Sequence, residues 1–274
     1  MGGAGTIARM AMTEMERGAA TARLEPMLPV DLPARPRAVA VLDGVLAGRV
    51  WADDAERPRA LLVIETADGT VYGGGDLARD AVANALTGVE TKSGDLIFGF
   101  RGPDDPMRDL VPGEPYWRGE AIDFTDRQPH TGEGGLPGGV EIVRIDATLL
   151  PRTEWAEDML HAFGSTDRWE ELGVGRAVVS DDELLAECLA GPRVRGLLEM
   201  GVITREAFRG RGYGTLVSRL VAEACEAAGD RVWWNANAGN EPSIRIARRI
   251  GFLRERRYEL VALHAPLGSA GPRA

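Results

Sequence analysis

The stretch TREAFRGRGYG, residues 204–214, places arginines and alternating glycines between an apolar run and a segment of helical spacing. Unpaired backbone N–H groups and the positive end of the dipole make a helix N-terminus an anion site. Glycine lets the backbone come close to a ligand with positive φ, and arginine reaches peripheral phosphates. The stretch therefore predicts a phosphate-binding loop. The alternative is a glycine-rich turn with two solvated arginines.

Two common phosphate loops do not match these residues. A P-loop needs a lysine followed by Ser or Thr, which this stretch lacks. A dinucleotide loop needs G-x-G-x-x-G and an acidic residue at the end of the next strand. Here the spacing is G-x-G-x-G, and the next strand-like run, RVWWNAN at 231–237, has no acid. What remains is the pattern R-x-x-G-x-G, formed by Arg209, Gly212 and Gly214.

This pattern resembles motif A of the GNAT (general N-acetyltransferase) superfamily, whose loop holds the pyrophosphate of acyl-coenzyme A. Downstream, NEPSIRIARRIGF resembles the second GNAT signature through Asn240, Ser243, Gly251 and Phe252. The resemblance covers about 140–262. The N-terminal half, above all 41–66, more weakly resembles the leading domain of a bacterial two-domain GNAT subfamily.

The resemblance implies a set of cofactor-binding residues. The strand before motif A would splay from its neighbour and bind the pantetheine arm through main-chain atoms of Val202, Ile203 and Thr204. The pyrophosphate would be wrapped by Arg209, Gly210, Arg211, Gly212, Tyr213, Gly214 and Thr215. Asn240 would contact the pantetheine arm, with Ser243 one helical turn further on. Asn240 and Ser243 also fit a simple helix start, with Pro242 in the first turn, and both interpretations stay open.

Acetyl transfer to an amine needs an unprotonated nucleophile, and a nearby carboxylate can act as general base. Glu199 is the candidate because it is an ionisable residue inside an apolar strand. The alternative is that it points outward or pairs with an arginine of the adjacent strand.

At the position of the general acid, this chain departs from the pattern of the GNAT superfamily. Many GNAT enzymes carry a tyrosine four residues after the helix serine, where this chain has Ala247. Tyr258 and Tyr213 remain as candidates, and the leaving thiolate can otherwise be protonated by solvent. Neither Cys188 nor Cys225 lies beside a histidine in a recognisable motif. Direct attack in a ternary complex is therefore expected, rather than an acyl-cysteine route.

Composition limits the partners. The 274 residues are 44% hydrophobic and 27% charged, as in an ordinary soluble protein of about two domains. A net charge of −10 disfavours nucleic acid and anionic membranes and is compatible with a cationic acceptor. Two cysteines without metal-ligand spacing predict no disulfide framework, no metal site and a cytoplasmic location. No apolar run reaches the length of a membrane span.

The predicted fold class is α/β, with an N-terminal α+β domain and a C-terminal GNAT fold of mixed, splayed sheet flanked by helices. The expected division is a leader at 1–30, the α+β domain at 31–135, the GNAT domain at 140–265 and a tail at 266–274. A Gly- and Pro-rich stretch at 128–139 is the boundary candidate. No internal repeat is visible in the sequence.

Several elements can be predicted from local patterns. Two strands flank ADGT at 67–70, a short helix covers 79–88 and another covers 153–163 with Thr153 as its cap. A long helix is expected from Tyr213 to Ala228, ending at Gly229. The run ELLAECLA at 183–190 reads as a strand, although a helix stays open.

The expected function is acyl-CoA-dependent N-acyltransfer, most simply of acetyl from acetyl-CoA to a primary amine of a small molecule. One alternative is a GNAT-like module that binds acyl-CoA without catalysis. Another is an acyltransferase with aminoacyl-tRNA as donor, which an arginine patch keeps open: Arg245, Arg248, Arg249, Arg254, Arg256 and Arg257. The acceptor, the acyl group and the choice between monomer and homodimer cannot be read from the sequence.

Overall fold

The computed structural model describes residues 11–18, 21–129 and 139–267. It divides into two compact units. Unit 1 comprises the residues up to Gly119 and those from Tyr258 onward, and unit 2 is Glu120–Arg257. The expected domain boundary at 128–139 falls almost wholly outside the described residues, as do residues 1–10 of the expected leader and most of the tail. The division into domains at 31–135 and 140–265 stays a prediction.

Unit 1 contains one mixed sheet, and its strands follow the order β1-β2-β3-β4-β5-β12. The strands are β1 (Thr13–Met15), β2 (Gly48–Ala52), β3 (Ala60–Glu65), β4 (Thr70–Gly75), β5 (Asp95–Phe100) and β12 (Phe252–His264), whose second half pairs with β5. Pairing is antiparallel except between β4 and β5. β3 is buried along its whole length: an uninterrupted apolar run covers Ala60–Ile64, and the last residue, Glu65, pairs with Arg37. The expected leader thus supplies an edge strand, β1.

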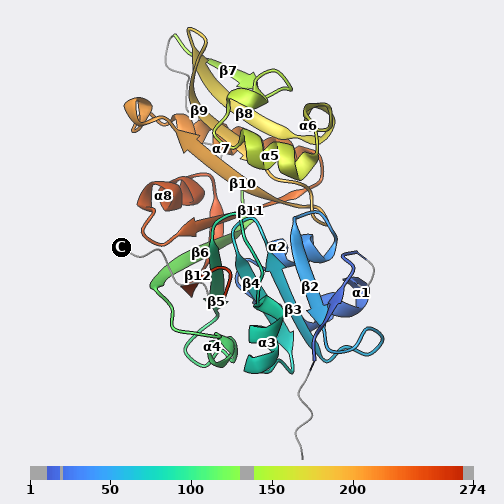
Figure 1. Cartoon of the computed structure of the whole chain (residues 1–274). Coiled ribbons are helices and arrows are strands. Elements are labelled where there is room, and N and C mark those ends of the chain that lie inside the picture. The colour runs from blue at the N-terminus through green and yellow to red at the C-terminus, as the bar shows by residue number, and fades with distance from the viewer. Residues whose placement is uncertain (1–10, 19–20, 130–138, 268–274) are drawn as a thin grey trace, which may run out of the picture. The chain divides into compact units, whose positions relative to one another are not determined.

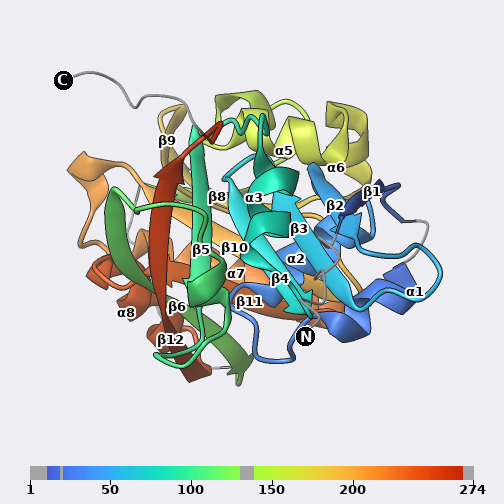
Figure 2. The same ribbon diagram turned by 60° about the horizontal axis from the view of Figure 1, so that its bottom comes forward.

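Helices cover both faces of the unit 1 sheet. They are α1 (Thr21–Leu24), α2 (Arg35–Leu42), α3 (Arg79–Leu86) and α4 (Met107–Leu110). Figure 2 shows α3 in front of the strands and α2 behind them. Val82 and Leu86 of α3 pack with Phe98 in one core cluster. On the α2 face, an added Cβ on Gly48 would lie 2.6 Å from a Val41 methyl group, so α2 packs closely against β2.

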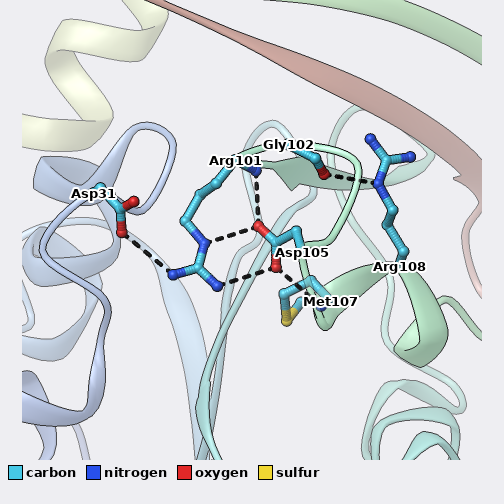
Figure 3. Close-up of polar contacts among 6 residues, drawn as sticks. All are labelled: Asp31, Arg101, Gly102, Asp105, Met107 and Arg108. Atoms are coloured by element: carbon cyan, nitrogen blue, oxygen red, sulfur yellow. Dashed lines mark hydrogen bonds and ion pairs between the residues drawn. The ribbon is translucent and has the colours of Figure 1, made fainter.

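The loop after β5 is fixed by a buried carboxylate (Figure 3). Asp105 accepts hydrogen bonds from the Arg101 guanidinium at 2.9 and 3.2 Å and from the backbone N–H of Met107 at 3.0 Å. Burial alone would raise the pKa of Asp105, but the hydrogen bonds from Arg101 and Met107 and the charge of Arg101 together lower the pKa. Arg101 also reaches Asp31, at 3.3 Å. This network holds the start of α4.

The strands of unit 2 pair in the order β6-β11-β10-β9-β8-β7, also with mixed directions (Figure 1). The strands are β6 (Trp117–Arg127, from Glu120), β7 (Glu141–Arg144), β8 (Val174–Ser180), β9 (Glu183–Ala190), β10 (Leu197–Thr204) and β11 (Arg231–Asn237). Only β10 and β11 pair in parallel. The stretch 183–190 is therefore a strand, not a helix.

Helices also cover both faces of the unit 2 sheet: α5 (Ala156–Phe163), α6 (Thr166–Leu172), α7 (Tyr213–Ala227) and α8 (Glu241–Arg249). In Figure 1, α5 and α6 lie on the side of strands β8–β10 that faces the viewer, and α7 lies behind. Leu198 and Met200 of β10 share a core cluster with α7 and α8. Leu189 of β9 belongs to a second cluster, with Trp169 of α6.

The two units repeat one pairing pattern. In each, a run of antiparallel strands ends in a strand that pairs in parallel with the next, and that partner pairs antiparallel with a last strand. One helix connects each parallel pair, α3 in unit 1 and α7 in unit 2. The sequence shows no such repeat. The last strand of each pattern is exchanged along the chain. β6 comes first in the sequence of unit 2, and the C-terminal half of β12, which completes unit 1, follows unit 2.

Candidate functional site

The parallel strands β10 and β11 separate halfway along their length. They pair over Leu197–Glu199 and Arg231–Trp233. From Met200 to Thr204, β10 continues its pairing with β9, and from Trp234 to Asn237, β11 pairs with β6. The pairing of β10 with β11 thus ends at Glu199. Val202, Ile203 and Thr204 lie beyond this point and are half-buried. This is the splayed sheet that the resemblance to the GNAT superfamily implies.

The three loop glycines are needed for two different reasons. Gly210 and Gly212 have φ of 78° and 83°, and an added Cβ on either would meet no atom within 4 Å. These two positions need glycine for their conformation, and they face open space. Gly214 packs closely: its added Cβ would lie 2.8 Å from Thr204 Oγ1 and 3.1 Å from Ile246 Cδ1. It lets the first turn of α7 lie against β10 and α8.

The start of α7 presents unpaired donors next to this open space. Gly212 is the N-cap, with no side-chain hydrogen bond to the helix. The first helical bond runs from the N–H of Leu216 to the carbonyl of Gly212. The N–H groups of Tyr213, Gly214 and Thr215 precede that bond, so the helix itself offers them no acceptor. Together with the helix dipole they are suited to bind an anion, and the phosphate-binding loop itself stays a prediction.

The two loop arginines are positioned differently. Arg209 Nε donates to the carbonyl oxygen of Thr204 at 3.2 Å, so its guanidinium lies at the end of β10. The guanidinium carbon of Arg211 lies 5.3 Å from the centre of the Phe208 ring. Both residues are exposed. The loop therefore holds two positive charges close to the splayed strands.

Helix α8 adjoins the same corner through Ile246. Its first predicted ligand residue, Asn240, is the exposed N-cap, and Asn240 Oδ1 accepts from the Ser243 N–H at 3.2 Å. Ser243 Oγ accepts from Trp234 Nε1 at 3.0 Å. The helix-start interpretation is therefore correct for both residues. A contact of either with a ligand stays a prediction.

Both tyrosine candidates are buried, each within its own unit. Ala247 is fully buried in the core cluster of unit 2, so this helix carries no proton donor there. The Tyr213 ring is buried in the same cluster, which leaves its backbone N–H at the loop. Tyr258 is a buried residue of unit 1, whereas Glu199 and the loop belong to unit 2.

Glu199 occupies the point where the two strands separate. It is half-buried and pairs in register with Trp233. Its neighbours Leu198 and Met200 point to the α7 face, so Glu199 points to the opposite face, with α5. A carboxylate at this position is suitable for accepting a proton from a nucleophile on that face.

A second carboxylate lies on this face, Glu187 of β9, which is not among the residues predicted from the sequence. Glu187 is only 3% exposed, and its burial raises the pKa of the carboxyl to about 6. Hydrogen bonds from the backbone of Glu154 and Trp155 lower this pKa, but the effect of burial is larger. The Glu154 N–H donates to Glu187 Oε1 at 2.8 Å. The signal that identifies Glu199, an acid within an apolar strand, applies equally to ELLAECLA.

The two cysteines are buried, and the other potential metal ligands of the described residues form no cluster. Cys188 and Cys225 are buried free thiols, and burial raises the pKa of both, that of Cys225 to about 11. Across the described residues, no group of three or more His, Cys, Asp and Glu side chains is placed to hold a metal ion. None of the helices in the described part of the chain is long and apolar enough to cross a membrane.

The splayed strands and the glycine loop at the start of α7 define a GNAT fold. The family model for GNAT acetyltransferases matches residues 33–261, which include most of both units. The chain belongs to the GNAT acetyltransferase family, and it is an N-acetyltransferase. An uncharacterized N-acetyltransferase of Bacillus subtilis (strain 168), YdfB, is 22% identical over 220 residues, which are 77% of this chain and 84% of that protein.

Solved structures share the fold. A GCN5-related N-acetyltransferase-like protein from Streptococcus suis 89/1591 matches with a TM-score of 0.59 and 18% identity, over 80% of this chain and 90% of that one. A tandem GNAT protein from the clavulanic acid biosynthesis pathway matches with a TM-score of 0.58 and 14% identity, over 94% and 99%. The second likeness extends over both units, in keeping with their common pairing pattern.

Proposed function

We propose that the chain transfers an acyl group, most simply acetyl from acetyl-CoA, to a primary amine of a small molecule. The observation that carries this proposal is the open anion site at the start of α7, directly beside the separated ends of β10 and β11. Loop residues Arg209–Thr215 would hold the diphosphate. Main-chain groups of Val202–Thr204 would hold the pantetheine arm, with Asn240 and Ser243 at its side.

The reaction proposed is direct attack within a ternary complex. The amine nitrogen attacks the thioester carbonyl carbon, Glu199 takes the proton that the nitrogen loses, and the C–S bond breaks. The thiolate leaves with the electron pair and takes a proton from solvent, because Ala247 offers none. Burial and raised pKa values keep both cysteines as thiols, which supports direct transfer over an acyl-cysteine.

The alternatives receive less support. Half of the arginine patch is neutralised within unit 2: Arg248 pairs with Glu255, Arg254 with Asp126 and Arg257 with Glu120. This pairing and the net charge of −10 disfavour a tRNA donor. Membership in an acetyltransferase family disfavours a module that only binds acyl-CoA. We propose the cytoplasm as the location, since the thiols are unpaired.

A matched pair of glycine variants tests the cofactor site. Gly212 and Gly229 lie at opposite ends of α7 with φ of 83° and 84°, and an added Cβ on either meets open space. Replacing each by leucine imposes the same backbone strain. Acetyl-CoA at about 100 times its Kd should stabilise the wild type and Gly229→Leu by about 2.7 kcal/mol, a shift of several degrees in Tm. Gly212→Leu should show no shift. A wild type indifferent to acetyl-CoA refutes the proposal.

The base is tested separately through Glu199→Gln, which keeps the shape of the side chain. Loss of the sole general base should lower kcat by about 10²-fold or more, with acetyl-CoA affinity almost unchanged. Equal losses of affinity and rate would show that Glu199 is structural.

A further inference from the structure

The indole of Trp155 lies against the backbone of β10 at Gly201. An added Cβ on Gly201 would come within 2.7 Å of two carbon atoms of this ring, Cη2 and Cζ3. Gly201 follows the last paired residue, Glu199, by two positions, so the contact lies where β10 has left β11. Trp155 is half-buried and packs on the cluster that contains Leu189, the partner of Gly201 across the β9–β10 pair.

Trp155 is held there by the buried carboxylate of Glu187. Trp155 is the N-cap of α5, and no side chain of α5 itself is fully buried. Glu187 Oε1 accepts the Glu154 N–H at 2.8 Å, and the Trp155 backbone also donates to this carboxylate. Glu187 pairs in register with Ile203 of β10. A carboxylate at a helix N-terminus is a favourable partner for both N–H groups and dipole.

The proposed path of the pantetheine arm ends at this indole. The anion site adjoins Thr204, on the α7 face of the sheet. Gly201 lies three residues, or about 10 Å, back along β10. Leu198 and Met200 point toward the α7 face, and successive residues of a strand alternate in direction. Residues 199, 201 and 203 therefore point away from that face. An arm that passes from the anion site between the separated strands therefore emerges on the side where Trp155 crosses Gly201.

We propose that Trp155 limits the length of the acyl chain, and that Glu187 is the positioning residue that holds Trp155 in place. The inference rests on the proposed function, since it needs an acyl-CoA at the splayed strands. A rigid ring against a glycine leaves room for a short acyl group. A longer chain has to displace the indole.

The test measures the Kd of CoA, acetyl-CoA, butyryl-CoA and hexanoyl-CoA by calorimetry. The wild type should bind hexanoyl-CoA at least about tenfold more weakly than acetyl-CoA, and Trp155→Ala should bind the two within about threefold. Trp155→Phe, a smaller change that keeps an aromatic ring, should give an intermediate ratio. The Kd of CoA should stay the same in all three, which also shows that each variant is folded.

Further variants separate positioning from general packing. Glu187→Gln keeps the acceptor oxygen and should retain the wild-type ratio, whereas Glu187→Leu should lose it as Trp155→Ala does. Trp117→Ala removes an exposed tryptophan of unit 1 and should change nothing. A ratio that is unaltered in Trp155→Ala, or a wild type that does not discriminate, overturns the inference. A wild type that binds none of the four ligands instead refutes the proposed function.

Discussion

At the scale of single residues, two glutamates with the same sequence signature have different environments. Glu199 and Glu187 each interrupt an apolar strand and point to the α5 face of the unit 2 sheet. Glu199 is half-buried at the point of strand separation. Glu187 is buried and accepts hydrogen bonds from the backbone before α5. The residue type predicts an acid of altered environment, but only the fold tells which one faces the splayed strands.

The raised pKa of Glu187 should make the folded protein less stable as the pH rises. Its folded pKa of about 6 exceeds the ordinary 4.5, so the folded state binds the proton more tightly. As pH rises from about 4 to 7.5, this group should therefore lower the free energy of unfolding by about 2 kcal/mol. In Glu187→Gln this decrease should be absent, as measured by the free energy of unfolding in urea at both pH values. Glu183→Gln, an exposed change on the same strand, should keep the wild-type dependence, and equal slopes for all three proteins would contradict the assignment.

The missing proton donor is also a matter of single residues. A thiol has an ordinary pKa of about 8.5, so the departing thiolate can be protonated by water near neutral pH. Tyr213→Phe and Tyr258→Phe should therefore retain near wild-type kcat. The pH–rate profile should show only the ascending limb of base or amine deprotonation. A descending limb near about pH 9 that disappears in Tyr258→Phe would identify Tyr258 as the general acid instead.

At the scale of elements, local patterns predict the region around the loop well. The helix expected from Tyr213 to Ala228 is α7, Tyr213–Ala227, and the hairpin around ADGT is β3 and β4. The cap of α5 was predicted wrongly: α5 begins at Ala156, and the Thr153 hydroxyl donates to Leu150 instead. Helix α6 was missed, although Ser165 caps it by accepting the Arg168 N–H. Tertiary contacts, such as those of Glu187, decide where α5 starts.

The packing of α7 on β10 depends on Gly214. An alanine there adds a methyl group 2.8 Å from Thr204 Oγ1 and 3.1 Å from Ile246 Cδ1, so these two side chains or the helix have to shift. Overpacking of this kind should lower the free energy of unfolding by about 1–3 kcal/mol and weaken acetyl-CoA binding. Gly239→Ala provides the control, because its added Cβ meets no atom within 4 Å. Denaturant titrations of both variants measure the difference, and two equal losses would contradict this account.

At the scale of the whole molecule, connectivity could not be predicted from local sequence. The chain enters unit 2 with β6, which pairs with β11 over Ala121–Phe124, and returns to unit 1 with β12, which pairs with β5. A segment that begins at residue 140 would lack the strand beside β11. Pairing between residues as distant in sequence as Phe124 and Trp234, or Phe100 and Glu259, has no local signature. The repeated pairing pattern of two units with unrelated residues has none either.

The repeated pattern raises the question of a second cofactor site, and the residues of unit 1 argue against one. There, β4 and β5 pair over Thr70–Val71 and Ile97–Phe98 and then continue with other partners. The space beside the separated strands is filled by the chain itself. An added Cβ would lie 2.5 Å from Met107 Sδ at Gly73 and 2.2 Å from the Met27 carbonyl oxygen at Gly74. Asp80 in the first turn of α3 would repel a phosphate.

We therefore expect one acyl-CoA per chain. Calorimetric titration of the wild type with acetyl-CoA should give a stoichiometry close to one, and Gly212→Leu should abolish all binding, because the loop at α7 is the sole site. Met107→Ala opens space at Gly73 in unit 1 and should leave the stoichiometry unchanged, since the acidic first turn of α3 remains. Residual binding by Gly212→Leu, or a stoichiometry close to two, would show that the repeated fold of unit 1 has kept a cofactor site of its own.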